Sequence, residues 1–320
     1  MAERSPAPVP TTVSPEMRAL IGAPLNPIWR ERPTTAEGWK ALVDSAAAAA
    51  VARLPALCAR LKVRFERTTA GGARAFLVTP EAVAPRNENR LLIHIHGGCY
   101  VLFPGEAGLP EAIMMAAFGG FRVLSVDYRM PPEAFFPAAL DDCVSVWKAT
   151  AETTGAARTA AFGTSAGGAL TLALVLRAKQ EGLPLPAAIA PGTPMADVTR
   201  TGDTFYTNEL LDNVLVSRDG FCDAATRFYA NGHDLADPLL SPVYGDMSGF
   251  PPAILTSGTR DLLLSNTVRV HRKLRQAGVD AALQVYEGQS HAHYMFNEQA
   301  PETREAFGEI AEFFDRRLVT

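Results

Sequence analysis

This sequence has few of the features that mark disulfide-rich or nucleic-acid-binding proteins. Its 320 residues include only four cysteines, which are far apart and form no Cys-x-x-Cys pair: Cys58, Cys99, Cys143 and Cys222. Such isolated cysteines argue against a disulfide framework and are typical of reduced thiols in a cytoplasmic protein. The net charge is −4 and no block of basic residues occurs, so nucleic acid is excluded as an expected partner.

Long apolar stretches are also scarce. Residues 1–12 are polar and rich in proline, and they lack the apolar centre of a signal peptide. The alanine run at residues 46–50 is interrupted by Arg53 and Pro55, so we expect no segment of membrane-spanning length. The sequence therefore predicts a soluble, cytoplasmic protein with neither nucleic acid nor a membrane as partner.

What is present favours a large globular fold. With 48% hydrophobic and 20% charged residues, the chain can bury a sizeable core. Short apolar runs alternate with helix-like segments, which predicts an α/β fold with a mostly parallel sheet flanked by helices. Strands are expected at residues 63–68, 75–78, 91–95, 122–126, 159–162, 185–190, 253–257 and 281–286, and helices at 35–61, 106–118, 138–150, 166–179, 265–276 and 302–318.

Two parts of the chain break this alternation. Residues 1–33 contain seven prolines and little periodicity, and residues 193–244 show no strand–helix rhythm. Segments of this kind often pack over a site as a lid. The expected division is a helical cap made of residues 1–50 and 193–240, and a catalytic core made of residues 51–192 and 241–320.

The most informative motif is Gly-x-Ser-x-Gly at residues 163–167, between an apolar run and a helix-like run. In this setting a sharp strand-to-helix turn exposes the serine hydroxyl, and small flanking residues let the backbone turn without clashes. The pentapeptide alone occurs by chance in about one chain in ten of this length. Its significance therefore depends on catalytic partners elsewhere in the chain.

Such partners follow Ser165 in the order Ser, Asp, His. A serine becomes a nucleophile when an imidazole takes its proton and a carboxylate orients that imidazole. Asp261 and His291 each come shortly after a predicted strand, where open α/β sheets bind ligands. His293 competes with His291 for the role of base, and its position in the motif favours His291.

Upstream, His96-Gly97-Gly98-Cys99 directly follows a predicted buried strand. Its glycines let backbone N–H groups approach a substrate oxygen, and the N–H group of Ala166 adds another donor. In this order the motifs resemble those of the hormone-sensitive-lipase-like family of microbial carboxylesterases, within the α/β-hydrolase fold. The resemblance runs from about residue 91 to the C-terminus and rests on residues 96–98, 127–133, 136–139, 141–142, 163–168, 241–242, 251–252, 258, 261 and 291.

The resemblance implies a serine esterase that needs neither metal nor organic cofactor and forms an acyl-enzyme. Ser165 is then the nucleophile, His291 the base and later the acid, and Asp261 its orienting group. The implied oxyanion donors are the backbone N–H groups of Gly98, Cys99 and Ala166, supported by His96 and Gly97.

Two residues set the chain apart within that family. Cys99 stands where the family usually has glycine, and its Cβ restricts the backbone angles. Threonine at position 164 resembles the pattern of one subgroup of the family, whereas aspartate is the commoner residue before the catalytic serine.

Other functions stay open at this point. The same triad serves amide or aryl-acylamide hydrolysis, and a non-catalytic ligand-binding relative shares the fold but typically lacks a triad member. His94-x-His96 and His291-x-His293 have the spacing of metal ligands and suggest a metallohydrolase, although we expect no metal. We expect small ester substrates, and the terminal edge strand and helix suggest a homodimer. The expected pocket residues are Tyr100, Phe103, Phe205, Tyr206 and Leu211.

Overall fold

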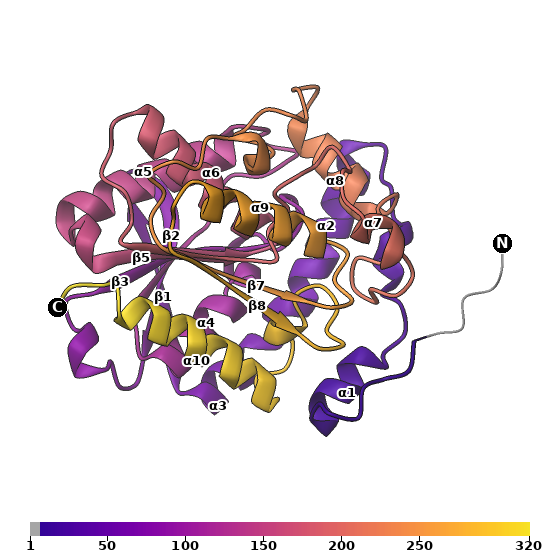
Figure 1. Cartoon of the computed structure of the whole chain (residues 1–320), viewed down its shortest axis with the longest axis horizontal. Coiled ribbons are helices and arrows are strands. Elements are labelled where there is room, and N and C mark those ends of the chain that lie inside the picture. The colour runs from indigo at the N-terminus through magenta and orange to yellow at the C-terminus, as the bar shows by residue number, and fades with distance from the viewer. Residues whose placement is uncertain (1–6) are drawn as a thin grey trace.

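The computed structural model describes residues 7–320 and contains one eight-stranded sheet (Figure 1). The strand order is β1-β2-β4-β3-β5-β6-β7-β8. All neighbours from β4 to β8 are parallel, whereas β2 is antiparallel to both β1 and β4. The predicted α/β fold with a mostly parallel sheet is thus confirmed. The strands are β1 (Val63–Ala70), β2 (Ala73–Pro80), β3 (Leu91–Ile95), β4 (Val123–Val126), β5 (Thr159–Thr164), β6 (Ala188–Gly192), β7 (Ala253–Gly258) and β8 (Ala281–Tyr286).

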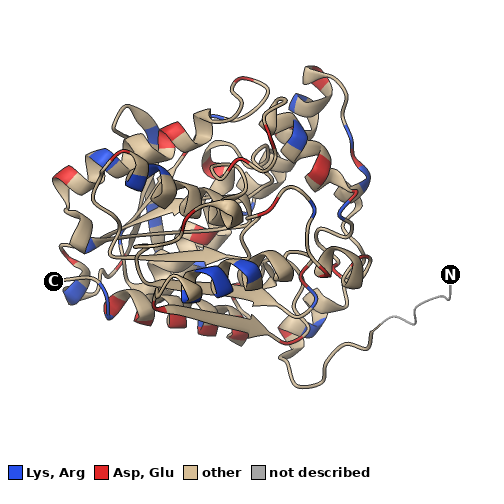
Figure 2. Cartoon of the chain, turned by 45° about the horizontal axis from the view of Figure 1, so that its top comes forward, with Lys and Arg blue, Asp and Glu red and all other residues tan. Residues whose placement is uncertain are grey.

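Helices cover both faces of the sheet, with α3, α4 and α10 on one face and α5, α6 and α9 on the other, whereas α2 and α8 lie to the side of the strands (Figure 1). Each face has its own hydrophobic core, because the central strands are buried on both sides and are almost continuously apolar. Acidic and basic residues are interspersed along the outer helices (Figure 2). The helices are α1 (Pro15–Ile21), α2 (Ala36–Val51), α3 (Leu54–Leu61), α4 (Pro110–Gly119), α5 (Ala138–Thr153), α6 (Ala166–Gln180), α7 (Thr204–Thr207), α8 (Phe221–Ala230), α9 (Leu264–Gln276) and α10 (Pro301–Asp315).

The helix predicted at residues 35–61 is in fact two helices, α2 and α3. Pro55 occupies the first turn of α3, where its missing N–H group costs no hydrogen bond. The stretch Ala36–Leu61 is long and apolar enough to cross a membrane, which corrects the expectation that no such stretch exists. Most of it is not buried, yet Trp39 and Val43 belong to the core of this fold.

The N-terminal segment packs against the insertion between β6 and β7, which contains α7 and α8. Trp39 of α2 stacks on Phe228 of α8 with ring centroids 4.8 Å apart, and it lies 5.8 Å from the ring of Phe221. The backbone N–H of Asn26 donates to the carbonyl oxygen of Asn213 over 2.9 Å. Two segments far apart in the sequence therefore meet on one side of the molecule (Figure 1).

Candidate active site

Ser165 occupies the turn between β5 and α6, with φ 63° and ψ −121°. A positive φ is uncommon for a residue with a Cβ and marks a strained turn. The N–H of Ser165 donates to the carbonyl oxygen of Gly192 over 2.9 Å. A Cβ on Gly163 or Gly167 would lie 2.1 or 1.8 Å from the carbonyl oxygen of Ile95. The glycines of the motif are therefore required by the close approach of β3.

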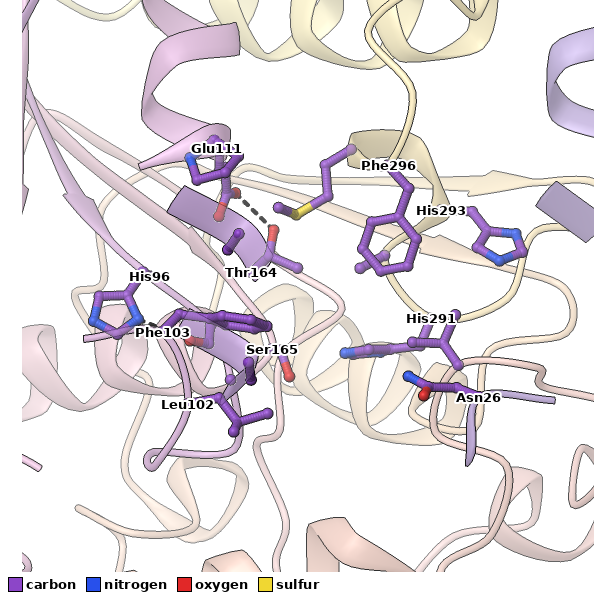
Figure 3. Close-up of a pocket in the computed structure, with 18 of the residues that line it drawn as sticks. Asn26, His96, Leu102, Phe103, Glu111, Thr164, Ser165, His291, His293 and Phe296 are labelled. Carbon is purple, nitrogen blue, oxygen red and sulfur yellow. Dashed lines mark hydrogen bonds between the residues drawn. The ribbon is translucent and has the colours of Figure 1, made fainter. Parts of the chain in front are cut away.

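His291 and Asp261 are in direct contact, on the loops that follow β8 and β7. Nδ1 of His291 lies 3.1 Å from Oδ1 of Asp261, and both side chains are buried. The imidazole of His291 points toward Ser165 across a cavity (Figure 3), and no hydrogen bond joins these two side chains in the part of the chain described. Burial lowers the pKa of His291, but the charge and hydrogen bond of Asp261 raise that pKa above its ordinary value.

The carboxylate of Asp261 is surrounded by donors. Ser257 Oγ donates to its Oδ2 over 2.7 Å, the hydroxyl of Thr193 donates to the same oxygen, and Leu263 N donates to Oδ1 over 2.8 Å. Burial alone raises the pKa of Asp261, but the charge of His291 and these hydrogen bonds lower it below its usual range. Asp261 is therefore ionised beside the imidazole.

A second buried carboxylate, Asp212, lies next to this pair. Its Oδ2 accepts from Leu262 N over 2.8 Å and from His291 N over 3.3 Å, and its Oδ1 accepts from Val214 N over 2.8 Å. Burial and the charge of Asp261 raise the pKa of Asp212 to about 6. Asp212 thus connects the insertion to both loops that carry the His–Asp pair.

The 96–103 loop after β3 faces Ser165 from the other side. Four of its residues have positive φ: Gly98 (114°), Cys99 (53°), Tyr100 (65°) and Phe103 (69°). A Cβ on Gly97 would lie 2.7 Å from the carbonyl oxygen of Thr164. Among residues 7–320, the N–H groups of Gly98 and Cys99 donate to no acceptor, which leaves them free for a ligand oxygen.

His96 fixes the start of this loop. Its Nδ1 lies 2.8 Å from the carbonyl oxygen of Gly97, and its ring stacks on Tyr128 with centroids 4.1 Å apart. The Tyr128 hydroxyl donates to the carbonyl oxygen of His96 over 2.9 Å. Burial lowers the pKa of His96 to about 3, so the ring is neutral and serves as a structural support.

A polar network lies buried directly beneath Ser165. Thr164 Oγ1 donates to Glu111 over 2.6 Å (Figure 3) and also contacts the hydroxyl of Tyr294. The other oxygen of Glu111 lies 3.1 Å from Nε2 of His94, whose Nδ1 lies 2.9 Å from Ser125 Oγ. The side chains of this network satisfy one another, as buried polar groups must.

These contacts explain the paired histidines without a metal. His94 and His96 bond to different partners, and Nδ1 of His293 accepts from Ser290 N over 3.2 Å. Burial and the nearby charge of His291 lower the pKa of His293 to about 4. Over residues 7–320, no three His, Cys, Asp or Glu side chains are grouped to hold a metal ion.

Ser165 and His291 line a cavity of about 630 Å³ together with the 96–103 loop, α2, α3, α8 and the N-terminal segment. Apolar side chains such as Leu54, Leu57 and Met114 form much of its wall. An apolar cavity with a few convergent polar groups is the usual form of a small-molecule site.

Of the five predicted pocket residues, only Phe103 lines this cavity. The prediction is wrong for the other four. Tyr100 is buried and stacks on Tyr229 with centroids 4.3 Å apart. Phe205 is buried in the core, Tyr206 is 58% exposed beneath the guanidinium of Arg218, and Leu211 does not reach the cavity.

Sequence reasoning missed three contributors to the site: Thr193, Asp212 and Glu111. Asp212 lies in the insertion, where no periodicity indicates which polar residues are buried. Glu111 lies in the predicted helix at residues 106–118 and is 5% exposed, and an acidic residue near a helix N-terminus normally indicates a solvated charge. No signal in the single sequence distinguishes these residues from surface ones.

Comparison with known proteins places this geometry in context. A family model described as the alpha/beta hydrolase fold matches residues 92–295. An esterase of Acinetobacter venetianus is 30% identical over 236 residues, which cover 73% of this chain and 77% of the relative. The crystal structure of an esterase named E25 matches with 43% identity and a TM-score of 0.95, over 99% of this chain and 98% of that one. An esterase from the bacterial hormone-sensitive lipase family matches with 28% identity and a TM-score of 0.77, over 95% and 99%.

Proposed function

Because this chain belongs to the α/β-hydrolase fold family, we propose that it is a serine carboxylesterase with Ser165, Asp261 and His291 as its catalytic triad. The chain is a carboxylic-ester hydrolase and resembles the hormone-sensitive-lipase group of esterases. The observation that supports the triad most directly is the buried His291–Asp261 pair, whose imidazole points at a strained serine (Figure 3).

In the first half-reaction, His291 takes the hydroxyl proton of Ser165 as its oxygen attacks the acyl carbon. Asp261 stays ionised and stabilises the imidazolium that forms. His291 then gives the proton to the departing alcohol oxygen, and the acyl group remains on Ser165. Water, deprotonated by the same imidazole, attacks the acyl-enzyme and releases the acid.

The negative oxygen of each tetrahedral intermediate is assigned to the backbone N–H groups of Gly98, Cys99 and Ala166. Two observations support this role: the first two N–H groups have no acceptor among residues 7–320, and the third is at the N-terminus of α6. Each such donor contributes about 3 kcal/mol of transition-state stabilisation. Cys99 supplies its N–H from a left-handed backbone conformation, so its Cβ does not prevent this role.

The cavity suits small and medium esters with apolar acyl or alcohol groups, because its wall is mostly aliphatic and aromatic. We assign the segments at residues 1–50 and 193–240 to a cap, since residues 20–50 of the first and 213–222 of the second contribute to this wall, and Trp39 and Phe228 pack on each other. The four cysteines are free thiols, which favours a cytoplasmic location. The homodimer stays a prediction from the sequence, and light scattering in solution tests it.

The test is hydrolysis of p-nitrophenyl esters by Ser165→Ala. We expect turnover to fall by about 10⁶-fold, the loss seen when a triad nucleophile is removed, without loss of circular dichroism. Ser145→Ala, on α5, where the hydroxyl donates to the carbonyl oxygen of Asp141 in the same helix, is the control and keeps its activity. Turnover by Ser165→Ala at more than a few per cent of the original rate contradicts the assignment.

A further inference from the structure

The cysteine that departs from the family pattern has a partner. The sulfur atoms of Cys99, in the 96–103 loop, and Cys222, in the first turn of α8, lie 2.7 Å apart. They are separated by 123 residues in the sequence. Both side chains line the cavity that contains Ser165, so a small solute that enters this cavity can reach them.

The contact joins the 96–103 loop to α8, two elements that both line the cavity. Cys99 is held at φ 53°, a conformation that favours glycine, so the choice of cysteine there is not conformational. A disulfide has an S–S distance of about 2.05 Å, and the two sulfurs need only a short further approach to reach it. The other two cysteines are remote from each other, and all four are free thiols.

We propose that Cys99 and Cys222 form a redox-modifiable dithiol, which hydroperoxides oxidise to a disulfide that tethers α8 to the 96–103 loop and reversibly lowers ester turnover. The effect on turnover rests on the proposed function, since it acts on the loop that carries the oxyanion donors. The formation of the disulfide does not depend on that function.

The chemistry balances with a hydroperoxide as the oxidant. The thiolate of Cys222, the more exposed of the two, attacks one peroxide oxygen, forms a sulfenic acid and releases hydroxide, or alkoxide from an alkyl hydroperoxide. The sulfur of Cys99 then attacks that of Cys222, which forms the S–S bond and expels the oxygen as water after it gains the Cys99 proton. Two thiols lose two electrons, and the O–O bond accepts both.

The surroundings of the pair determine its pH dependence. The hydrogen bond with Cys99 and burial raise the pKa of Cys222 well above its ordinary value, and the carboxylates of Asp212 and Asp223 act in the same direction. Because the thiolate is the reactive form, oxidation is expected to be slow at neutral pH and to accelerate as pH rises. His291 also lines this cavity.

The experiment treats the full-length enzyme with hydrogen peroxide at pH 8, then maps peptides without reduction by mass spectrometry and measures ester turnover before and after dithiothreitol. We expect a Cys99–Cys222 linked peptide and a fall in turnover of up to about 100-fold, comparable to one misplaced oxyanion donor. Dithiothreitol restores the activity. Cys58→Ser responds in the same way.

Cys222→Ser, compared with its own untreated activity, is the deciding variant and is expected to show no reversible loss. Absence of the linked peptide overturns the proposal, as does an equal, reversible loss in Cys222→Ser. A linked peptide with unchanged turnover overturns the proposal that the disulfide lowers ester turnover. Ser165→Ala still forms the disulfide, so a failed triad assignment is distinguishable from a failed redox site.

Discussion

His291 has carboxylates on two sides. Asp261 contacts Nδ1 of its ring at 3.1 Å, and Asp212 accepts from its backbone N–H. Burial lowers the pKa of His291, whereas the charge and hydrogen bond of Asp261, and then the charge of Asp212, raise it further than burial lowers it. The imidazole that must be neutral to act as base therefore protonates at a pH above the ordinary value of about 6.5.

The pH profile of kcat/KM follows from this upward shift in the pKa of His291. As pH falls through the raised pKa, His291 gains a proton and loses its ability to accept one from Ser165, so kcat/KM has an acidic limb above pH 6.5. Asp261→Asn removes the main orienting charge and is expected to lower kcat by about 10⁴-fold. Steady-state kinetics from pH 5 to 9 measure both. A profile that stays flat down to pH 5 contradicts the assignment of His291 as base.

Asp212→Asn is expected to move that acidic limb to lower pH. The charge of Asp212 is one of the causes that raise the pKa of His291, so its removal lowers that pKa. Asp142→Asn, which loses the bonds of another buried carboxylate to Arg129, controls for loss of stability alone and leaves the limb in place. An unmoved limb in Asp212→Asn assigns Asp212 a purely structural role.

At the residue scale, the sequence was enough to predict that Asp261 and His291 form a pair, but it did not predict which side chains surround them. Asp261 and His291 were identifiable because they follow strands in the expected order, and their side chains are in contact in the structure. His293 lay two residues away with the same chemistry, and only the bonds around it distinguish it. No sequence pattern marked Asp212, because the burial of an aspartate in a loop depends on contacts with distant segments of the chain.

Among the elements, the β5–turn–α6 unit imposes the strictest steric requirement on the site. Gly167→Ala places a methyl group 1.8 Å from the carbonyl oxygen of Ile95, and both atoms belong to rigid elements. We expect a loss of more than about 3 kcal/mol in the free energy of unfolding, as for other overpacked cores, or failure to fold. Gly308→Ala, in α10 with no atom within 4 Å of the new Cβ, is expected to gain about 0.5–1 kcal/mol. Urea unfolding measures both, and equal stability of the two variants contradicts this account.

Most strands and helices were predictable, because their apolar periodicity is strong and their ends carry glycine or proline. The errors are at ends and breaks. The helix predicted at residues 35–61 divides at Ala52 and Arg53, and the strand predicted at 185–190 is β6, Ala188–Gly192. The alanine-rich segment favours helix on both sides of Pro55. The sequence therefore showed that Pro55 interrupts the alanine run, but not that the helix ends there.

At the scale of the whole molecule, segments that are far apart in the sequence line the cavity together. Asn213 Nδ2 donates to the carbonyl oxygens of Leu20 over 2.8 Å and Ala23 over 3.0 Å, and its N–H donates to Ser290 Oγ over 3.2 Å. The N-terminal segment is thereby attached to the loop that carries His291. The sequence indicated that residues 1–33 and 193–244 were irregular, but their mutual packing depends on long-range contacts that no local pattern specifies.

Asn213→Ala is expected to loosen this attachment. Loss of these two partly buried hydrogen bonds should cost about 1–3 kcal/mol. It should raise KM for apolar esters more than it lowers kcat, since the reacting groups are untouched. Faster hydrogen exchange in residues 15–30 is the direct readout. Ser14→Ala, which removes the hydroxyl bond of Ser14 to Glu302 and its N-cap bond with Met17 N but leaves the backbone bond of Ser14 to Glu302 in place, is the comparison variant. Unchanged exchange in Asn213→Ala shows that other contacts hold the segment.

The buried bond between Thr164 and Glu111 constrains how the nucleophile motif can be exchanged between relatives. An aspartate at 164, the commoner residue of the wider family, would place a second carboxylate against the one that already accepts from the threonine hydroxyl. Two carboxyl groups that are buried against each other cannot both be ionised, so they must share a proton or move apart. Positions 111 and 164 are therefore expected to be inherited as a pair, and a graft of the pentapeptide alone into this scaffold carries a hidden incompatibility.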